Sequence, residues 1–336
     1  MPYTTIRVRA TKEEIMAKIL SHKNKRNNLM ITILLVTSIV ITNSLVVFSP
    51  DEDSRFFFSN LTSTLTVGVP LVIAFVMVFR YKRSMKKQEE IPQVLSQPDK
   101  DIHYYYDNNK MHLSICVFLV LWFVAHVIWT FQYRQASDVS IADALWFIGY
   151  GFFGYFLYSL YYHFFRKEFE PFILILMAII IVIALVFVVD IISSTFRLLS
   201  TQTVDISVLL VTTVYPILDA ILIFPAALIF WGARRISSER KNATLEQKIK
   251  VITEEHKTSS PASVSSIWIL LLSISMILSA IGDTGFAYST AYGPDIVQRD
   301  VWIWDIFYTS FGLCLAAALI GYRSFFSFNR IDTLQH

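Results

Sequence analysis

The residues that decide the fold form the stretch FILILMAIIIVIALVFVV, from Phe172 to Val189. Every residue in it is apolar, and about 20 such residues are what a helix needs to cross the hydrocarbon layer of a bilayer. A strand of an outer-membrane barrel would instead alternate apolar and polar residues over about ten positions. Because this stretch alternates nowhere, it predicts a transmembrane helix.

Other stretches of similar length and character recur along the chain. The 336 residues are 54% hydrophobic, 15% aromatic and only 16% charged, and the mean hydropathy is +0.52. A water-soluble domain of this size does not need so much apolar surface. The sequence therefore predicts an all-α, polytopic membrane protein with eight transmembrane helices. The predicted spans run from Leu29 to Phe48, Leu61 to Phe79, His112 to Phe131, Ile141 to Phe165, Phe172 to Ile191, Ile206 to Trp231, Ser266 to Tyr288 and Val301 to Tyr322.

Basic residues fall almost entirely on one side of these spans, and none lies inside a span. With both termini inside, the outer loops hold only four of the 29 Lys and Arg residues, namely Arg55, Arg134, Arg197 and Arg299. This is the positive-inside bias. It predicts a multi-pass protein of the cell membrane with both termini in the cytoplasm. The basic inner surface is typical of a topology signal and of lipid-headgroup contact, and no nucleic-acid partner is expected.

The spans form two groups of four with the same rhythm of short outer, long inner and short outer loops. Aligning the two groups places His126 opposite Asp283 and Asp143 opposite Asp305. Four spans per copy predict parallel repeats, related by an axis along the membrane normal. The expected divisions are a cytoplasmic N-terminal segment 1–28 without a signal-peptide core, a first half 29–165, an inner linker 166–171, a second half 172–323 with a cytoplasmic loop 232–265, and a cytoplasmic tail 324–336.

Searches for catalytic motifs find none, so we expect neither an enzyme nor a cofactor. The stretch GYGFFG, Gly149 to Gly154, matches the dinucleotide pattern GxGxxG but lies inside a span with no strand before it. Its glycines, like Gly312 and Gly321, are better explained as positions where helices approach closely. The only cysteines, Cys116 and Cys314, lie in apolar spans and are expected to be packing residues. No particular metal is indicated.

Two aspartates lie well inside the spans, where a carboxylate costs about 2.5–3.5 kcal/mol on insertion scales. Asp219 is mid-span in YPILDAILIFP, and Asp283 lies in the outer third of its span, in SAIGDTGFAYSTAYG. With no Lys or Arg in any span, the two carboxyl groups must be protonated, share a proton, take a charge from His126 or bind an external cation. We expect them to lie close together and to titrate as a coupled set, in a polar and aromatic pocket that opens outward. Its candidate ligand- or cation-binding residues are Asp219, Asp283, Asp305, Asp143, His126, Tyr215, Tyr308 and Tyr150.

Simpler explanations remain open for part of this set. Tyr and Trp near span ends are typical of interface belts. Asp143 and Asp305 lie near the outer boundary, where arginines of the adjacent outer loops are available as partners. A lone histidine such as His126 is more often a satisfied polar residue between helices than a ligand. Asp219 and Asp283 are left without such an explanation.

Three segments, ADALWFIGYG, YPILDAILIF and GDTGFAYSTAYG with the later WDIFYTSFG, carry a family resemblance. They resemble the multi-span N-terminal sensor regions of some bacterial and archaeal signalling proteins, including diguanylate cyclases. Such regions carry short Asp-containing helices of the forms D-x-x-Y, Y-P-x-x-D and D-x-x-W, and the resemblance covers spans three, four and six to eight. No cyclase, kinase or other output domain precedes His336. The resemblance therefore implies a stimulus-sensing module that signals through a separate partner.

Three functions fit these observations. The sequence favours a sensor or receptor in the lipid bilayer that binds a small molecule or cation in the outer pocket and contacts a signalling partner at the cytoplasmic face. The alternatives are a cation- or proton-coupled transporter that uses Asp219 and Asp283, and a structural subunit of a membrane complex. The inner halves of the spans carry few polar residues to line a water path, which argues against transport.

Overall fold

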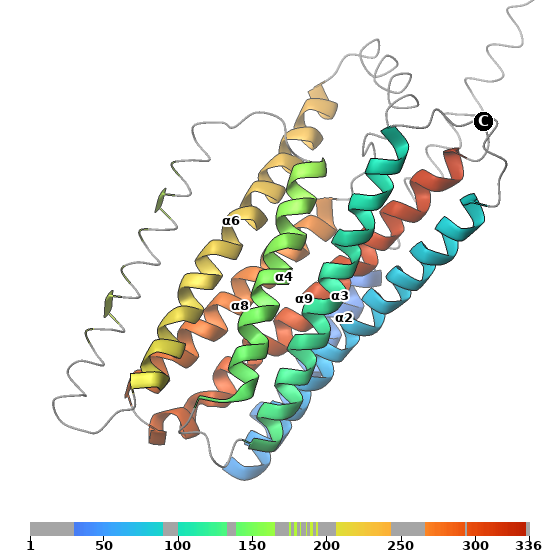
Figure 1. Cartoon of the computed structure of the whole chain (residues 1–336). Helices are drawn as coiled ribbons and strands as arrows, with labels where there is room; N and C mark the ends of the chain where they lie inside the picture. Colours follow the sequence, from blue (N-terminus) through green and yellow to red (C-terminus); the bar gives the residue numbers. More distant parts are fainter. Residues whose placement is uncertain are drawn as a thin grey trace, which may run out of the picture.

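The computed structural model describes residues 30–89, 100–132, 139–164, 206–242, 266–292 and 294–333, together with isolated positions between 175 and 193. All of the secondary structure in these residues is helical. A first helix runs from Met30 to Val47. The others are α2 (Glu52–Glu89), α3 (Lys100–Gln132), α4 (Ile141–Phe164), α6 (Ile206–Asn242), α8 (Ser266–Tyr292) and α9 (Pro294–Thr333) (Figure 1).

Within the described residues, seven helices are long and apolar enough to cross a membrane. This confirms the all-helical, multi-pass membrane class. The fifth predicted span, Phe172 to Ile191, lies outside the described residues apart from isolated positions, so the eighth helix in the count stays a prediction. The last two spans agree with the predicted bounds, since their apolar stretches run from Ile267 to Ser289 and from Trp302 to Tyr322. The helices themselves extend further, because α8 continues to Tyr292 and α9 already begins at Pro294. Proline suits the first position of a helix, where its missing N–H is not needed.

A side-chain cap defines where α2 begins. The Asp51 carboxylate accepts hydrogen bonds from the backbone N–H of Ser54 at 2.7 Å and from the Ser54 hydroxyl at 2.9 Å. The backbone bond from Ser54, followed by the hydroxyl bond, lowers the pKa of Asp51 below its ordinary value. This capped turn joins the first helix to α2 at one end of the molecule.

Six helices form a closed ring in which each contacts the next in chain order, from α2 through α3, α4, α6 and α8 to α9, and α9 contacts α2. In Figure 1, α3 and α8 run opposite to the other four. The Met30–Val47 helix packs beside this ring, where its Leu35 contacts Cys314 and Ala317 of α9. The ring has an approximate internal symmetry that pairs α2 with α6, α3 with α8 and α4 with α9. When each helix is replaced by its pair, the same helices remain neighbours and each position keeps its direction.

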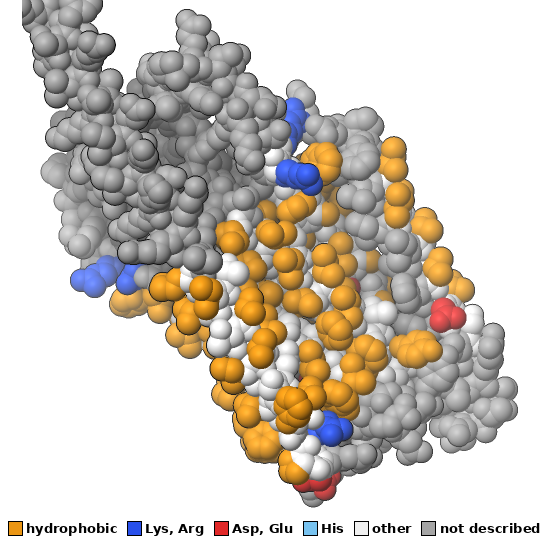
Figure 2. Space-filling model, turned by 180° about the vertical axis from the view of Figure 1, so that it is seen from behind, with side chains coloured by type: hydrophobic (Ala, Val, Ile, Leu, Met, Phe, Trp, Pro, Cys, Tyr) orange, Lys and Arg blue, Asp and Glu red, His pale blue; other side chains and the backbone are white. Residues whose placement is uncertain are grey.

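Apolar side chains fill the ring and also cover its outside. Phe118 and Phe153 stack with ring centroids 4.3 Å apart, and both are fully buried. On the outside, Phe79 and Val72 of α2 are 68% and 63% exposed. Figure 2 shows hydrophobic side chains over the middle of one face, with most of the described Lys and Arg side chains toward one end. Such a surface suits contact with lipid tails and not with water.

Glycines set the distance between several helices, as predicted, but not at every expected position. A Cβ atom at Gly312 of α9 would lie 2.8 Å from the carbonyl oxygen of Thr66 in α2, and one at Gly321 would lie 2.6 Å from the Cβ of Trp268 in α8. The prediction was wrong for Gly151, where an added Cβ would meet nothing within 4 Å. Gly312 and Gly321 therefore permit close helix crossings, whereas Gly151 does not.

Gly312→Ala is expected to destabilise the protein by about 1–3 kcal/mol, the usual cost of overpacking. The new methyl group meets backbone atoms of α2, so the two helices must move apart. Thermal unfolding in lipid nanodiscs, followed by helical circular dichroism, measures the loss. Gly151→Ala is the matched control and should be neutral or slightly stabilising, because Ala is the better helix former. Equal effects of the two substitutions would contradict the close crossing of α9 and α2.

Candidate functional site

Two buried aspartates from different helices share one tyrosine hydroxyl. The Tyr150 hydroxyl of α4 lies 2.9 Å from Oδ1 of Asp219 in α6, and it is also hydrogen-bonded to Oδ2 of Asp283 in α8. The Tyr308 hydroxyl of α9 donates to Oδ1 of Asp283. We call these four residues the acid–tyrosine cluster. The prediction that Asp219 and Asp283 lie close together is confirmed.

The cluster holds its carboxyl groups away from water and from compensating charge. Asp219 and Asp283 are 2% and 8% exposed, and no Lys or Arg lies within the predicted spans. Oδ2 of Asp219 has no hydrogen-bond partner among the described residues. A buried carboxylate without a partner is strongly unfavourable, so this arrangement needs a proton or a cation.

The geometry at Tyr150 also limits where protons lie. A phenol has one proton to donate, yet its oxygen is within hydrogen-bonding distance of both carboxyl groups. Both contacts are satisfied at once if Tyr150 donates to one aspartate and the other aspartate is protonated and donates to the phenol oxygen. Such an arrangement would couple the protonation of the two carboxyl groups.

Asp143 lies at the start of α4, where it has a structural task. Its Oδ2 accepts a hydrogen bond from the backbone N–H of Ser140 at 2.8 Å, while the Ser140 hydroxyl accepts one from Ala142 N–H at 3.1 Å. These reciprocal bonds form a capping box. Oδ1 of Asp143 accepts a third bond, at 2.7 Å, from the hydroxyl of Tyr215 in α6. Asp143 and Tyr215 thus join two helices beside the cluster instead of belonging to it.

Asp305 lies one helical turn before Tyr308 but makes its own hydrogen bond, separate from those of the cluster. The Ser59 hydroxyl of α2 donates to Oδ2 of Asp305 in α9. Further along α9, the side-chain amide of Asn43 in the first helix is 3.4 Å from the Ser310 hydroxyl. Sequence reasoning missed Ser59, although a polar SNLTST stretch at the start of an apolar span was a usable signal.

His126 lies among aromatic rings and not beside a carboxyl group. Its ring centroid is 5.5 Å from that of Trp146 and 6.3 Å from that of Tyr308. The His126 ring makes no hydrogen bond to any part of the chain that the structure describes, and the residue is only 7% exposed. The role of His126 as a binding residue therefore stays a prediction.

Half-buried aromatic residues lie near the cluster, toward the end of the bundle where α8 ends and α9 begins. Trp129 of α3 lies 5.9 Å from both Trp146 of α4 and Phe286 of α8, measured between ring centroids. With Tyr308 of α9 they form what we call the aromatic mouth. Trp129 and Trp146 thus contact each other between the neighbouring helices α3 and α4, whereas Trp129 and Phe286 join helices that are not neighbours in the ring.

Two glycines of α8 make room for aromatic rings of α9, Gly282 for Tyr308 and Gly285 for Trp304, and sequence reasoning missed them. A Cβ at Gly282 would lie 2.9 Å from the Tyr308 ring, and one at Gly285 would lie 2.1 Å from the Trp304 ring. Only hydrogen atoms at these positions let the α9 rings lie directly on α8. The usable signal was the spacing G-D-T-G, which places Asp283 between the two contact points.

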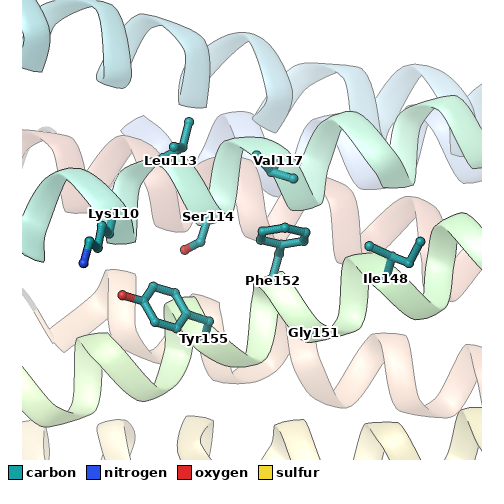
Figure 3. Close-up of a pocket in the computed structure, with 8 residues that line it drawn as sticks. All are labelled: Lys110, Leu113, Ser114, Val117, Ile148, Gly151, Phe152 and Tyr155. Atoms are coloured by element: carbon teal, nitrogen blue, oxygen red, sulfur yellow. The ribbon is translucent and has the colours of Figure 1, made fainter.

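A groove lies elsewhere, on the outward face of α3 and α4. Its volume is about 430 Å³, and Figure 3 shows Lys110, Ser114, Phe152 and Tyr155 among the residues that line it, with Gly151. No member of the acid–tyrosine cluster contributes to it. Across the described residues, no three His, Cys, Asp or Glu side chains are grouped to hold a metal ion.

Comparisons with protein-family models, with curated proteins and with solved structures find no match to this chain. The resemblance to sensor regions of signalling proteins therefore stays a prediction. The function has to be inferred from the acid–tyrosine cluster and its surroundings.

Proposed function

We propose that the protein is a membrane sensor that binds a small cation at the acid–tyrosine cluster and signals through a separate partner at the cytoplasmic face. The observation that carries the proposal is the pair of buried carboxyl groups that share the Tyr150 hydroxyl. A cation bound there replaces the shared proton and compensates the carboxylates. Intramembrane carboxyl groups without a structural partner are functional by default.

The cluster lies toward the end of the bundle that the proposal takes as extracellular. Asp283 is near the C-terminal end of α8, while Asp219 and Tyr308 are near the start of the apolar stretches of α6 and α9. Those helix ends meet at the lower end of the bundle in Figure 1. The positive-inside distribution of Lys and Arg supports an outward orientation of this end. The aromatic mouth then supplies an approach for a cation, since aromatic faces attract positive charge.

Sensing is better supported than transport because large apolar side chains fill most of the far side of the cluster. The buried polar groups on that side, such as His112 and Tyr322, lie at the opposite end of the ring. The inner half of the ring is filled by fully buried side chains, including Phe156, Leu160, Ile229 and Leu319. A transported cation needs polar groups along its path, and these residues offer none. By contrast, α6 continues past the end of its apolar stretch at Gly232 to Asn242, which provides a rigid connection toward a cytoplasmic partner.

Cation binding gives the test of this proposal. The protein in nanodiscs is titrated with sodium, potassium, calcium and tetramethylammonium ions, and its unfolding midpoint is recorded. One of them is expected to stabilise the fold by about 2.7 kcal/mol at 100 times its Kd. The stabilisation should grow as pH rises, because the shared proton competes with the cation.

Asp305→Asn serves as the control, since Asp305 bonds to Ser59 outside the cluster. It should keep the cation response that Asp219→Asn loses. A response equally sensitive to both substitutions, or no response to any cation, overturns the proposal. Cation-driven proton flux in proteoliposomes, with a pH dye inside, would instead favour the transporter.

We also propose that the two halves arose by duplication. Together with the sequence alignment of the two halves, the exchange of α4 for α9 places Asp143 on Asp305 and Trp146 on Tyr308. The bonds follow the same exchange: Tyr215 to Asp143 links α6 to α4, and Ser59 to Asp305 links α2 to α9. Repeats related by an axis along the membrane normal have this property.

A further inference from the structure

Beside the acid–tyrosine cluster lies a second group of polar atoms, which lack hydrogen-bond acceptors instead of donors. Nε1 of Trp122 and Nε1 of Trp146 are buried and have no acceptor among the described residues. The imidazole of His126 lies between them, with ring centroids 6.5 Å from Trp122 and 5.5 Å from Trp146. Trp122 is only 3% exposed. We call these three residues the donor set, because indole N–H groups can only donate and imidazole offers a ring N–H.

The donor set and the acid–tyrosine cluster are in direct contact. The Trp122 ring lies 5.2 Å from the Tyr150 ring, between centroids, and the hydroxyl of Tyr150 contacts both aspartates. Tyr308 forms a second link, because its hydroxyl bonds to Asp283 while its ring lies 6.3 Å from His126. The two groups therefore lie side by side in the bundle.

The proposed duplication explains why one group consists of hydrogen-bond donors and the other of carboxyl groups. The exchange of halves places His126 on Asp283 and Trp146 on Tyr308. The ring contact between His126 and Trp146 thus corresponds to the hydrogen bond between Tyr308 and Asp283. One half offers hydrogen-bond donors at the position where the other half offers carboxyl groups.

We propose that the ligand of this site is a small zwitterion, with an ammonium group on the acid–tyrosine cluster and a carboxylate on the donor set. The inference rests on the proposed cation binding and adds the second charged group. Buried indole N–H groups without an acceptor are unfavourable, and a carboxylate is the acceptor that bonds to them most strongly. An ammonium group supplies a donor to Oδ2 of Asp219, the cluster oxygen that has no partner among the described residues, and it compensates the negative charge.

A matched series of small probes tests the proposal in nanodiscs at constant pH. Propylammonium carries only the positive group, propionate only the negative group, and glycine, 3-aminopropionate and 4-aminobutyrate carry both at increasing separation. Dissociation constants come from the shift of the unfolding midpoint with probe concentration. At least one zwitterion is expected to bind about tenfold or more tightly than propylammonium, which is the effect of one hydrogen bond to a charged group.

Trp122→Phe keeps the ring and removes the N–H, so it should weaken the zwitterion while leaving propylammonium unchanged. Trp268→Phe, which alters a buried indole in the inner half of α8, should affect neither probe. If propylammonium binds and no zwitterion binds more tightly, the zwitterion inference is wrong and cation binding stands. If a zwitterion binds more tightly but Trp122→Phe leaves that advantage intact, the donor set is not its carboxylate site and the inference is wrong. If no probe binds, the zwitterion inference is wrong, and the site does not bind organic cations either. The titration with metal ions then decides whether the proposed cation binding stands.

Discussion

Asp283→Asn is expected to abolish cation binding while leaving the protein folded. Asparagine has nearly the shape of a protonated aspartic acid and offers an oxygen to the Tyr150 and Tyr308 hydroxyls that now bond to Asp283. It carries no charge and has no carboxyl proton that a cation could replace. The measurement is the midpoint shift with cation, together with helical circular dichroism and gel filtration to check folding. A loss of at least about 100-fold in affinity is expected for removing a buried charge partner.

Asp283→Leu separates the functional from the structural contribution of this side chain. It should also abolish binding, but it leaves two tyrosine hydroxyls without their acceptor, at about 1–3 kcal/mol each. The leucine variant should therefore unfold at a lower temperature than the asparagine variant. If Asp283→Asn binds the cation as the native protein does while it loses stability, the carboxyl group is a packing element and the proposed site is wrong.

Tyr150→Phe is expected to have the second large effect, because it removes the one hydroxyl that both aspartates share. Asp219 then loses its bond at Oδ1, and its Oδ2 already has no partner among the described residues. The buried carboxyl group becomes unsatisfied, at a cost of about 1–3 kcal/mol or more in unfolding free energy. The pH dependence of cation binding should also change, because the proton is no longer shared. Unfolding curves and cation titrations at several pH values measure the two effects.

Tyr158→Phe is the matched control for this substitution. Tyr158 lies on the same helix, α4, but is 60% exposed on the outside of the bundle. Removing its hydroxyl should change neither stability nor binding by more than about 0.5 kcal/mol, as is usual for exposed positions. Equal effects at the two tyrosines would mean that the bridge between the aspartates does not contribute.

Some of the candidate site was accessible from the sequence because it depends on periodicity within one helix. The spacing of Tyr215 and Asp219 places them near one face of α6. Because the spans contain no Lys or Arg, the sequence also predicts that the buried aspartates lie close together. The structure brings Asp219 and Asp283 together on Tyr150. Asp143 was grouped with them, yet it caps α4. The S-x-x-D pattern from Ser140 to Asp143 already indicated that role.

Membrane class and helical content follow from the sequence alone, because a bilayer requires long apolar runs whose backbone bonds are satisfied within each helix. The tertiary structure decided which faces meet. The ring order placed Ser59 on Asp305 and Tyr308 on Asp283, and Gly282 and Gly285 let the α9 rings lie on α8. Such contacts join residues far apart in the chain, and they depend on side-chain volumes at helix crossings, which no periodicity within a single helix encodes.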